Sequence, residues 1–275
     1  MLLDDFSLEM TGKDIGDLAD ARGVIPPGTR INVTFLGHED LAVRLAAAQA
    51  VEAAGFIPVP HVSARRLASR QMLEDFLAAL RAAGVSDEVF VVGGDPADPH
   101  GPYPDSLSII ESGVLEEYGV RRASIAGYPE GHPDIPYDIL WNALADKSAA
   151  LRKRSLDGDI ITQFGFDVDP VLDWIAAVRE RGIDAPVRIG VPGPAGVRRL
   201  LRYAARFGVG TSASIARKYG LSITNLMGTA GPDRFLRALA TDYHPGTHGE
   251  IKLHFYTFGG LRATAEWIRD FAKEH

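Results

Sequence analysis

Two kinds of hydrophobic pattern alternate along the chain. Short runs rich in β-branched and aromatic residues are typical of buried strands, and longer runs with an apolar residue every three or four positions are typical of amphipathic helices. Eight strands are predicted on this basis, at residues 6–10, 31–36, 56–61, 88–93, 122–127, 159–164, 187–191 and 251–257. A helical run follows nearly every one of them.

The helical runs carry their own boundary signals. Three of them end at a glycine of the kind that stops a helix at its C′ position, namely Gly55, Gly84 and Gly182. In the run 168–182 the start is also predicted, with Asp169 as the N-cap and Pro170 as the first helical residue. In the run 39–55 the apolar stripe contains Leu41, Leu45 and Ala48.

Strands that alternate with helices predict a parallel sheet. With eight units in 275 residues, the predicted fold is a (β/α)8 TIM barrel, one catalytic domain over residues 1–275, with extra helices at 212–219 and 232–241 between the last two strands. A doubly wound sheet is the rival, but it would need a glycine fingerprint after the first strand. The one G-x-G-x-x-A match, at 208–213, follows a helical run instead.

Composition narrows the function. The net charge of −7 without a long basic run argues against a nucleic-acid partner, and no apolar stretch reaches the roughly 20 residues that a membrane span needs. The chain has no cysteine, which removes disulfides and thiolate catalysis and fits a reducing compartment. The expectation is a cytoplasmic enzyme or binding protein that has no nucleic-acid or membrane partner.

Polar side chains stand at the predicted strand ends, where a barrel of this kind carries its chemistry. They are Glu9, Thr34, His61, Asp95, Tyr128, Glu130, His132, Gln163, His254 and Tyr256. Each one alone is more often a capped or solvated loop residue. Together they would converge on one mouth that offers carboxylate, amide and imidazole groups.

Seven segments that contain these side chains, taken in order along the chain, resemble the methylenetetrahydrofolate reductases: "SLEM", "INVTF", "VPHV", "GGDP", "YPEGHP", "ITQFGFD" and "LHFYTF". The resemblance covers essentially the whole chain. It implies an FAD-containing (β/α)8 barrel of one-carbon metabolism that reduces 5,10-methylenetetrahydrofolate to 5-methyltetrahydrofolate. NADH or NADPH would be the electron donor in a ping-pong sequence, and a homo-oligomer is possible.

The resemblance also implies roles for individual residues. Glu9 matches the general acid that protonates N10 of the folate, and Asp95 matches a carboxylate that contacts both flavin and pterin. Gln163 matches the glutamine that hydrogen-bonds folate and nicotinamide in turn, an assignment that suits an amide with donors and an acceptor. Asp95, Gln163 and Arg262 are the substrate-binding candidates.

A larger set falls at flavin-contacting positions of the family: Thr34, Phe35, His61, Gly94, Asp95, Tyr103, Tyr128 and His132. Asp146, Arg152 and Lys153 match an acidic-then-basic set that holds the FAD ribose and pyrophosphate, although a solvated helix face explains them equally well. The chain departs from the family in several places, and from Glu9 onward it reads "EMTGKD", where the family usually has an aromatic residue and two prolines after the glutamate. Gly93 stands where many members have an arginine, and Phe258-Gly259-Gly260 replaces a familiar Asn-Arg.

Other readings stay open. The glycine-rich turn 190–197 could bind phosphate in a flavin-free lyase or aldolase, although tight turn chemistry explains it as well. A flavin- or folate-binding protein that needs a partner as electron donor is a further alternative. His244, His248 and His254 invite a zinc site, but Pro245 and Gly246 are expected to break the helix that such spacing needs, so no metal is predicted.

Overall fold

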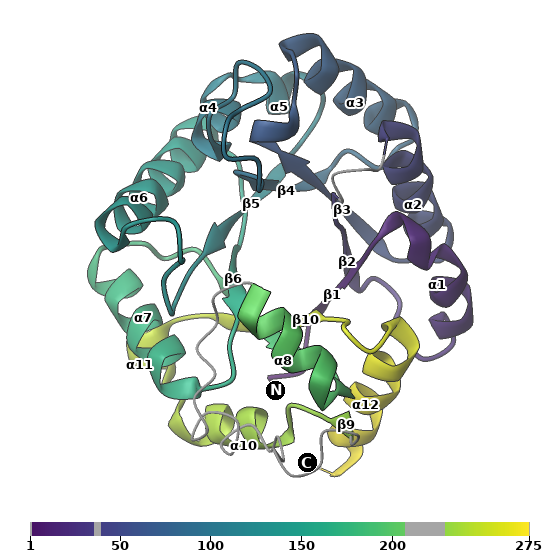
Figure 1. Cartoon of the computed structure of the whole chain (residues 1–275), viewed down its shortest axis with the longest axis vertical. Helices are drawn as coiled ribbons and strands as arrows, with labels where there is room; N and C mark the ends of the chain where they lie inside the picture. The colour runs from purple at the N-terminus through teal and green to yellow at the C-terminus, as the bar shows by residue number, and fades with distance from the viewer. Residues whose placement is uncertain (1, 36–39, 207–228, 275) are drawn as a thin grey trace.

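Eight parallel strands close into a barrel in the computed structural model, which describes residues 2–35, 40–206 and 229–274 (Figure 1). Around the barrel the strands follow the order β1-β10-β7-β6-β5-β4-β3-β2. Their bounds are β1 Ser7–Met10, β2 Arg30–Val33, β3 Ile57–Ser63, β4 Glu88–Val92, β5 Arg122–Gly127, β6 Ile160–Phe164, β7 Val187–Pro192 and β10 Ile251–Tyr256. The prediction of a (β/α)8 barrel is confirmed.

Helices surround the barrel or lie at its C-terminal end (Figure 1). They are α1 Ile15–Ala21, α2 Leu41–Ala53, α3 Arg70–Ala82, α4 Ser106–Glu111, α5 Val114–Glu117, α6 Tyr137–Arg154, α7 Val168–Glu180, α8 Val197–Arg206, α10 Asp233–Asp242, α11 Pro245–His248 and α12 Leu261–Glu274. Two 3-10 turns, η1 Gly12–Asp14 and η2 Ala64–Arg66, and a small antiparallel pair, β8 Ala195–Gly196 with β9 Thr229–Ala230, complete the described elements.

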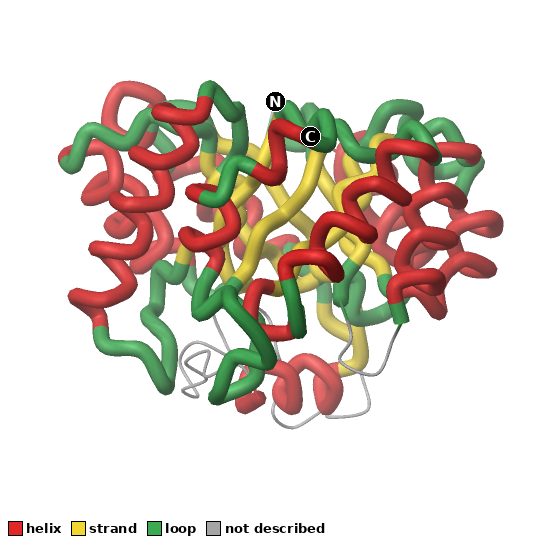
Figure 2. Tube along the Cα trace, turned by 90° about the horizontal axis from the view of Figure 1, so that it is seen from above, coloured by secondary structure: helices red, strands yellow, loops and turns green. Residues whose placement is uncertain are grey.

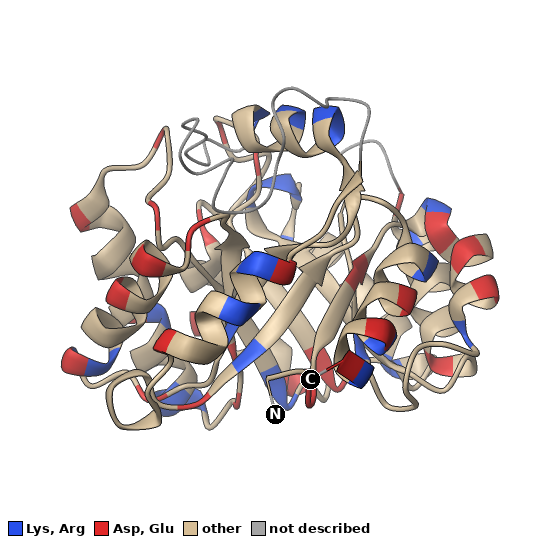
Figure 3. Ribbon diagram, turned by 90° about the horizontal axis from the view of Figure 1, so that it is seen from below, with Lys and Arg blue, Asp and Glu red and all other residues tan. Residues whose placement is uncertain are grey.

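The long connection between β7 and β10 contains extra helices, as expected. α10 confirms the helix predicted at 232–241. The helix predicted at 212–219 and the glycine match at 208–213 lie outside the described residues. α8 lies at the end of the barrel opposite to both chain termini (Figures 2 and 3). That end is the C-terminal end of the strands, where a barrel site is expected.

The predicted start of α7 is wrong by two residues. The N-cap is Asp167, whose backbone is extended and whose side chain accepts a hydrogen bond from the Asp169 backbone N–H at 3.4 Å. Asp169 and Pro170 are therefore the second and third helical residues. Proline is tolerated there because backbone N–H groups in the first turn have no partner within the helix.

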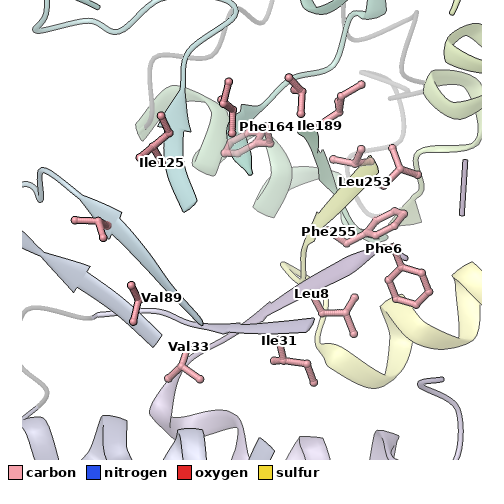
Figure 4. Close-up of a cluster of buried hydrophobic side chains, with 14 of the residues drawn as sticks. Phe6, Leu8, Ile31, Val33, Val89, Ile125, Phe164, Ile189, Leu253 and Phe255 are labelled. Carbon is pink, nitrogen blue, oxygen red and sulfur yellow. The ribbon is translucent and has the colours of Figure 1, made fainter. Parts of the chain in front are cut away.

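The main hydrophobic core lies between the sheet and the surrounding helices (Figure 4). Leu8, Ile31 and Leu253 are among the strand residues with no solvent exposure. Because side chains alternate along a strand, their neighbours Ser7 and Glu9 face the barrel interior instead. The interior is thus free to carry polar chemistry while the outer layer holds the fold together.

A ring of six charged side chains crosses the interior at the N-terminal end of the barrel. Its ion pairs are Asp5–Arg30 at 2.9 Å, Arg30–Glu88 at 2.8 Å, Glu88–Arg122 at 3.7 Å, Arg122–Asp159 at 3.0 Å, Asp159–Arg188, and Arg188–Asp5 at 3.1 Å. Arg30 on β2 reaches Glu88 on β4 across the intervening β3, so these side chains lie inside the barrel. Three positive and three negative groups alternate, and the ring closes this end.

Candidate active site

Half-exposed side chains mark the C-terminal mouth of the barrel. In the C-terminal halves of the eight strands almost every residue is buried, and the exceptions are Glu9, Val92, Ala126, Gln163 and Tyr256. Each is the last or next-to-last residue of its strand. A ligand at this end would rest on these side chains, which form the floor of the mouth.

Glu9 belongs to a chain of three polar side chains inside the barrel. Its Oε2 lies 3.5 Å from Nε2 of His254, and Nδ1 of His254 lies 2.9 Å from the hydroxyl of Ser7. His254 has no solvent exposure, and its Nε2 makes no hydrogen bond to any described residue. The Ser7 hydroxyl is also within 3.4 Å of the Leu253 carbonyl. A proton on Nδ1 would leave Nε2 as an acceptor facing Glu9.

The backbone of Glu9 is also held in place. The Thr257 hydroxyl, just after β10, donates a hydrogen bond of 2.6 Å to the Glu9 carbonyl. β1 and β10 are neighbours in the barrel, so this contact joins the exits of two adjacent strands. The backbone of Glu9 is therefore held in place, while its side chain remains partly exposed at the mouth.

His61 at the end of β3 is a buried, neutral imidazole. Burial lowers its pKa to about 4; the Glu9 carboxylate opposes this shift, while His254 and Arg44 add to it. The Nε2 atom lies 3.4 Å from Nδ2 of Asn32, and the ring packs edge-on against Phe90 at 4.8 Å. At neutral pH this side chain offers a hydrogen bond without a charge.

This shift predicts a loss of stability in acid. The pKa of His61 is lower in the folded protein than in the unfolded chain, so the unfolded chain takes up the proton first as the pH falls below about 6.5. Between pH 7 and pH 4.5 the free energy of unfolding should fall by about 2–3 kcal/mol more in the wild-type protein than in His61→Gln. Urea unfolding at both pH values measures this difference, and equal losses would contradict the assignment.

Two tyrosines line the mouth as neutral phenols. Burial raises the pKa of Tyr256 well above its usual value, and the Glu9 carboxylate and Tyr128 raise it further. Burial also raises the pKa of Tyr128. The Tyr256 hydroxyl donates to the Thr162 carbonyl at 3.1 Å, and its ring packs edge-on against His254 at 4.9 Å. Tyr256 thus links Glu9, His254 and the end of β6.

An aromatic ring between two guanidinium groups forms the β2 side of the mouth. The centroid of Phe35 lies 3.6 Å from the Arg44 guanidinium carbon and 5.5 Å from that of Arg66. Arg44 is fully buried, lies 4.4 Å from the Phe76 ring, and donates a hydrogen bond of 3.1 Å to the His61 carbonyl. Arg44 is three residues after Leu41 and four before Ala48, so it lies on the apolar stripe of the helix. A charged residue on that stripe was the signal that could have identified Arg44 as a buried cation.

The three proposed catalytic residues all occupy strand ends at this mouth, with different contacts. Asp95, after β4, forms an ion pair with Arg66 and keeps an exposed side chain. The Gln163 side chain accepts a hydrogen bond from the Phe164 backbone N–H at 3.1 Å. No contact joins Glu9, Asp95 and Gln163 to one another among the described residues, so a ligand would have to bridge them.

Several other candidates lie farther from the floor. Tyr103 is buried close to Arg70 and Glu74 of α3, and burial raises its pKa. Arg262 is exposed and pairs with Glu266 at 2.9 Å within α12. The His132 ring packs edge-on against Tyr128 at 5.4 Å, on the loop that follows β5.

The basic pair on α6 is not brought to the mouth. Asp146, Arg152 and Lys153 are exposed, and the last two lie in the final turn of α6. α6 begins near the mouth at Tyr137, and a rise of about 1.5 Å per residue places Lys153 about 24 Å farther along the helix axis. Their assignment to a cofactor remains a prediction.

The glycine-rich turn 190–197 packs closely against neighbouring segments of the chain. A Cβ added to Gly193 would lie 2.6 Å from the Thr264 hydroxyl, and the Gly193 N–H donates to the Tyr256 carbonyl at 2.9 Å. A Cβ on Gly259, in the facing loop, would lie 2.0 Å from the Pro194 carbonyl. Close approach of two loops therefore explains these glycines without a phosphate.

The three histidines of the zinc reading have other partners. Pro245 begins the short helix α11, so the expectation that it breaks a helix here is wrong; proline suits this first position. Nδ1 of His248 accepts a hydrogen bond from the His244 backbone N–H at 3.0 Å, and His254 contacts Ser7. Within the described ranges no three His, Cys, Asp or Glu residues are grouped as a metal site.

Fold and site together define a (β/α)8 barrel with partly exposed polar side chains at the C-terminal end of its strands. The sequence matches the family described as "Methylenetetrahydrofolate reductase" over residues 28–268. The chain belongs to the methylenetetrahydrofolate reductase family, and the resemblance noted in the sequence is confirmed.

Individual relatives agree with this membership. The chain is 28% identical over 130 residues to methylenetetrahydrofolate reductase 2 of Saccharomyces cerevisiae, which is 44% of this chain and 21% of that protein. It is 28% identical over 154 residues to 5,10-methylenetetrahydrofolate reductase of Pectobacterium carotovorum subsp. carotovorum, which is 56% of this chain and 49% of that protein. The matches thus span half or less of these relatives.

A solved structure supports the fold alone. Dihydropteroate synthase from Thermus thermophilus superposes with a TM-score of 0.50 at 14% identity, covering 98% of this chain and 94% of that one. No helix in the described part of the chain has the length and apolarity to cross a membrane.

The residues at the mouth fit the ring system of a flavin, the cofactor implied by the family resemblance. An isoalloxazine ring needs hydrogen-bonding groups at its edges and apolar contact on its faces. Thr34, His61 and Gln163 would supply the polar edge, and the partly exposed Val92 and Ala126 would supply an apolar part of the floor. The buried Nε2 of His254 is a further polar atom aimed at Glu9 beside this floor.

Proposed function

We propose that this chain, as one catalytic domain, reduces 5,10-methylenetetrahydrofolate to 5-methyltetrahydrofolate with electrons from NADH or NADPH. The observation that carries the proposal is the carboxylate Glu9 at the mouth, placed against the buried His254–Ser7 pair. FAD, when bound, would carry the hydride from donor to substrate. Thr34, Phe35, His61, Gly94 and Tyr128 would hold it.

Glu9 is proposed to protonate N10 of the folate. The five-membered ring of the substrate must open to a cationic iminium before it can accept a hydride, and a positioned carboxylic acid makes this opening possible. The Nε2 atom of His254 lies 3.5 Å from the Glu9 carboxyl oxygen, and the Thr257 hydroxyl holds the Glu9 backbone. The neutral His61 adds no positive charge that would oppose the cation.

Asp95 and Gln163 are proposed to orient and stabilise the substrate. A carboxylate close to the opened folate would favour its cationic form by electrostatic attraction. The Gln163 amide, whose oxygen accepts a hydrogen bond from the Phe164 backbone N–H, has donors and an acceptor that suit folate and nicotinamide in turn. One mouth used by two successive ligands predicts ping-pong kinetics.

A visible spectrum of the purified protein tests the cofactor assignment. We expect a yellow preparation that absorbs at roughly 450 nm, because oxidised flavin would be the group that carries the hydride. NADH or NADPH should bleach this band without air, and methylenetetrahydrofolate should restore it. A colourless protein that also takes up no added FAD would contradict the proposal.

A further inference from the structure

Arg66 is a cation near the exit of β4 whose side chain is not committed to holding the loop there. It is the last residue of η2, directly after β3, and its side chain is largely shielded from solvent. Its guanidinium forms an ion pair with Asp95 and lies 5.5 Å from the centroid of Phe35. In the described part of the chain these are its interactions.

The preceding residue, Arg65, has a different task. Its Nε donates to the Pro104 carbonyl at 2.7 Å, its Nη1 donates to the Pro96 carbonyl at 3.3 Å, and its backbone N–H donates to the Gly93 carbonyl at 2.9 Å. Arg65 therefore anchors the loop that follows β4. The two neighbouring arginines thus differ, because Arg65 holds the loop through backbone carbonyls and Arg66 pairs with the exposed carboxylate of Asp95.

The exit of β4 has open space at Gly93. Gly93, which stands where many family members have an arginine, has no atom within 4 Å of an added Cβ. Gly94 has a φ of +91°, a backbone conformation that favours glycine and turns the chain toward Asp95. The guanidinium of Arg66, which belongs to the turn directly after β3, thus lies next to the exit of β4, and that exit has no basic side chain of its own.

The Arg66–Asp95 pair is suited to exchange. The Asp95 side chain is 69% exposed and that of Arg66 is 15% exposed. An ion pair with a well-solvated partner contributes little to stability, whereas a diphosphate offers more negative charge and several oxygens to the planar guanidinium. A dinucleotide at the mouth can therefore compete with Asp95 for Arg66.

We propose that Arg66 binds the diphosphate of the flavin dinucleotide and that cofactor binding thereby releases Asp95. This inference rests on the proposed function, because it requires FAD at the mouth. It assigns to Arg66 the basic role that Gly93 cannot have. It also means that the carboxylate of Asp95 becomes available for the folate only in the protein that carries its cofactor.

The test compares the binding of FAD and riboflavin to the apoprotein by flavin fluorescence. Riboflavin has the same ring without phosphate. Arg66→Ala should therefore weaken the binding of FAD at least about ten-fold and leave the affinity for riboflavin within about two-fold of the wild-type value. Arg66→Lys should give an intermediate loss, because lysine keeps the charge and loses the fork. Asp95→Asn should tighten FAD binding or leave it unchanged, and Arg121→Ala, which removes an arginine from the exposed pair with Asp87, is the matched control.

Three outcomes would overturn the assignment. If Arg66→Ala weakened the binding of riboflavin and of FAD equally, the Arg66–Asp95 pair would support the site of the flavin ring and not bind the diphosphate. Equal weakening of FAD in Asp95→Asn would mean that the intact pair is required. Unchanged FAD with weakened NADH binding to the flavin-loaded protein would assign Arg66 to the nicotinamide donor. A wild-type protein that binds neither riboflavin nor FAD would instead refute the proposed function itself.

Discussion

Replacing Glu9 with glutamine should abolish folate reduction and leave the reduction of the flavin by NADH or NADPH intact. The amide keeps the shape of the side chain and loses the proton that the folate needs, and loss of a general acid typically costs about 10²–10⁴-fold in rate. The two half-reactions can be followed separately in a stopped-flow spectrometer at the flavin band. Flavin reduction should remain within about three-fold of the wild-type rate.

Glu9→Asp provides the matched control, because it keeps the acid and shortens the side chain by one methylene. Its folate half-reaction should lie between those of the wild-type protein and Glu9→Gln. Ser7→Ala should slow the same half-reaction less than Glu9→Gln, since it acts only through His254. If both half-reactions of Glu9→Gln proceed at the wild-type rate, Glu9 is not the acid.

Asp159→Asn should be the most damaging conservative change outside the mouth. The Asp159 carboxylate is buried and pairs with Arg122 at 3.0 Å and with the buried Arg188. Removing one partner leaves buried positive charge without full compensation, and the expected loss in the free energy of unfolding is about 3–5 kcal/mol. Urea unfolding at neutral pH measures it.

Asp87→Asn is the control for this prediction. Asp87 forms an ion pair with Arg121 in which both side chains are well exposed, so its loss should cost below about 1 kcal/mol. Both changes remove one carboxylate from an arginine pair and differ mainly in burial. Similar losses for the two variants would show that the ring of charges contributes no more than a surface pair.

Periodicity was sufficient to predict the barrel because each strand and helix satisfies its own local pattern. The alternation in β1 that buries Leu8 also turns Glu9 inward, so the strand ends could be identified as the mouth without coordinates. The start of α7 was misplaced because Asp167 and Asp169 are both good N-cap residues. Only the extended backbone of Asp167 distinguishes them.

The contacts that refine the site could not be derived from spacing. Arg66 meets Asp95, 29 positions along the chain, and Ser7 meets His254 across the closure of the barrel, 247 positions apart. Such pairs depend on which strands are neighbours and on side-chain rotamers, neither of which a one-dimensional pattern contains. Arg44 is different, because its place on an apolar stripe could have indicated a buried cation, although Arg44 was not among the residues predicted for the site.

The ring of alternating charged side chains at the N-terminal end of the barrel has a consequence for how ligands enter and leave the site. Because this ring of ion pairs lies at the N-terminal end of the barrel, the proposed ligands would both enter and leave at the opposite end. A donor nucleotide that has given up its electrons would block the arrival of the folate until it departs. The proposed ping-pong order is consistent with one shared entrance for the two ligands.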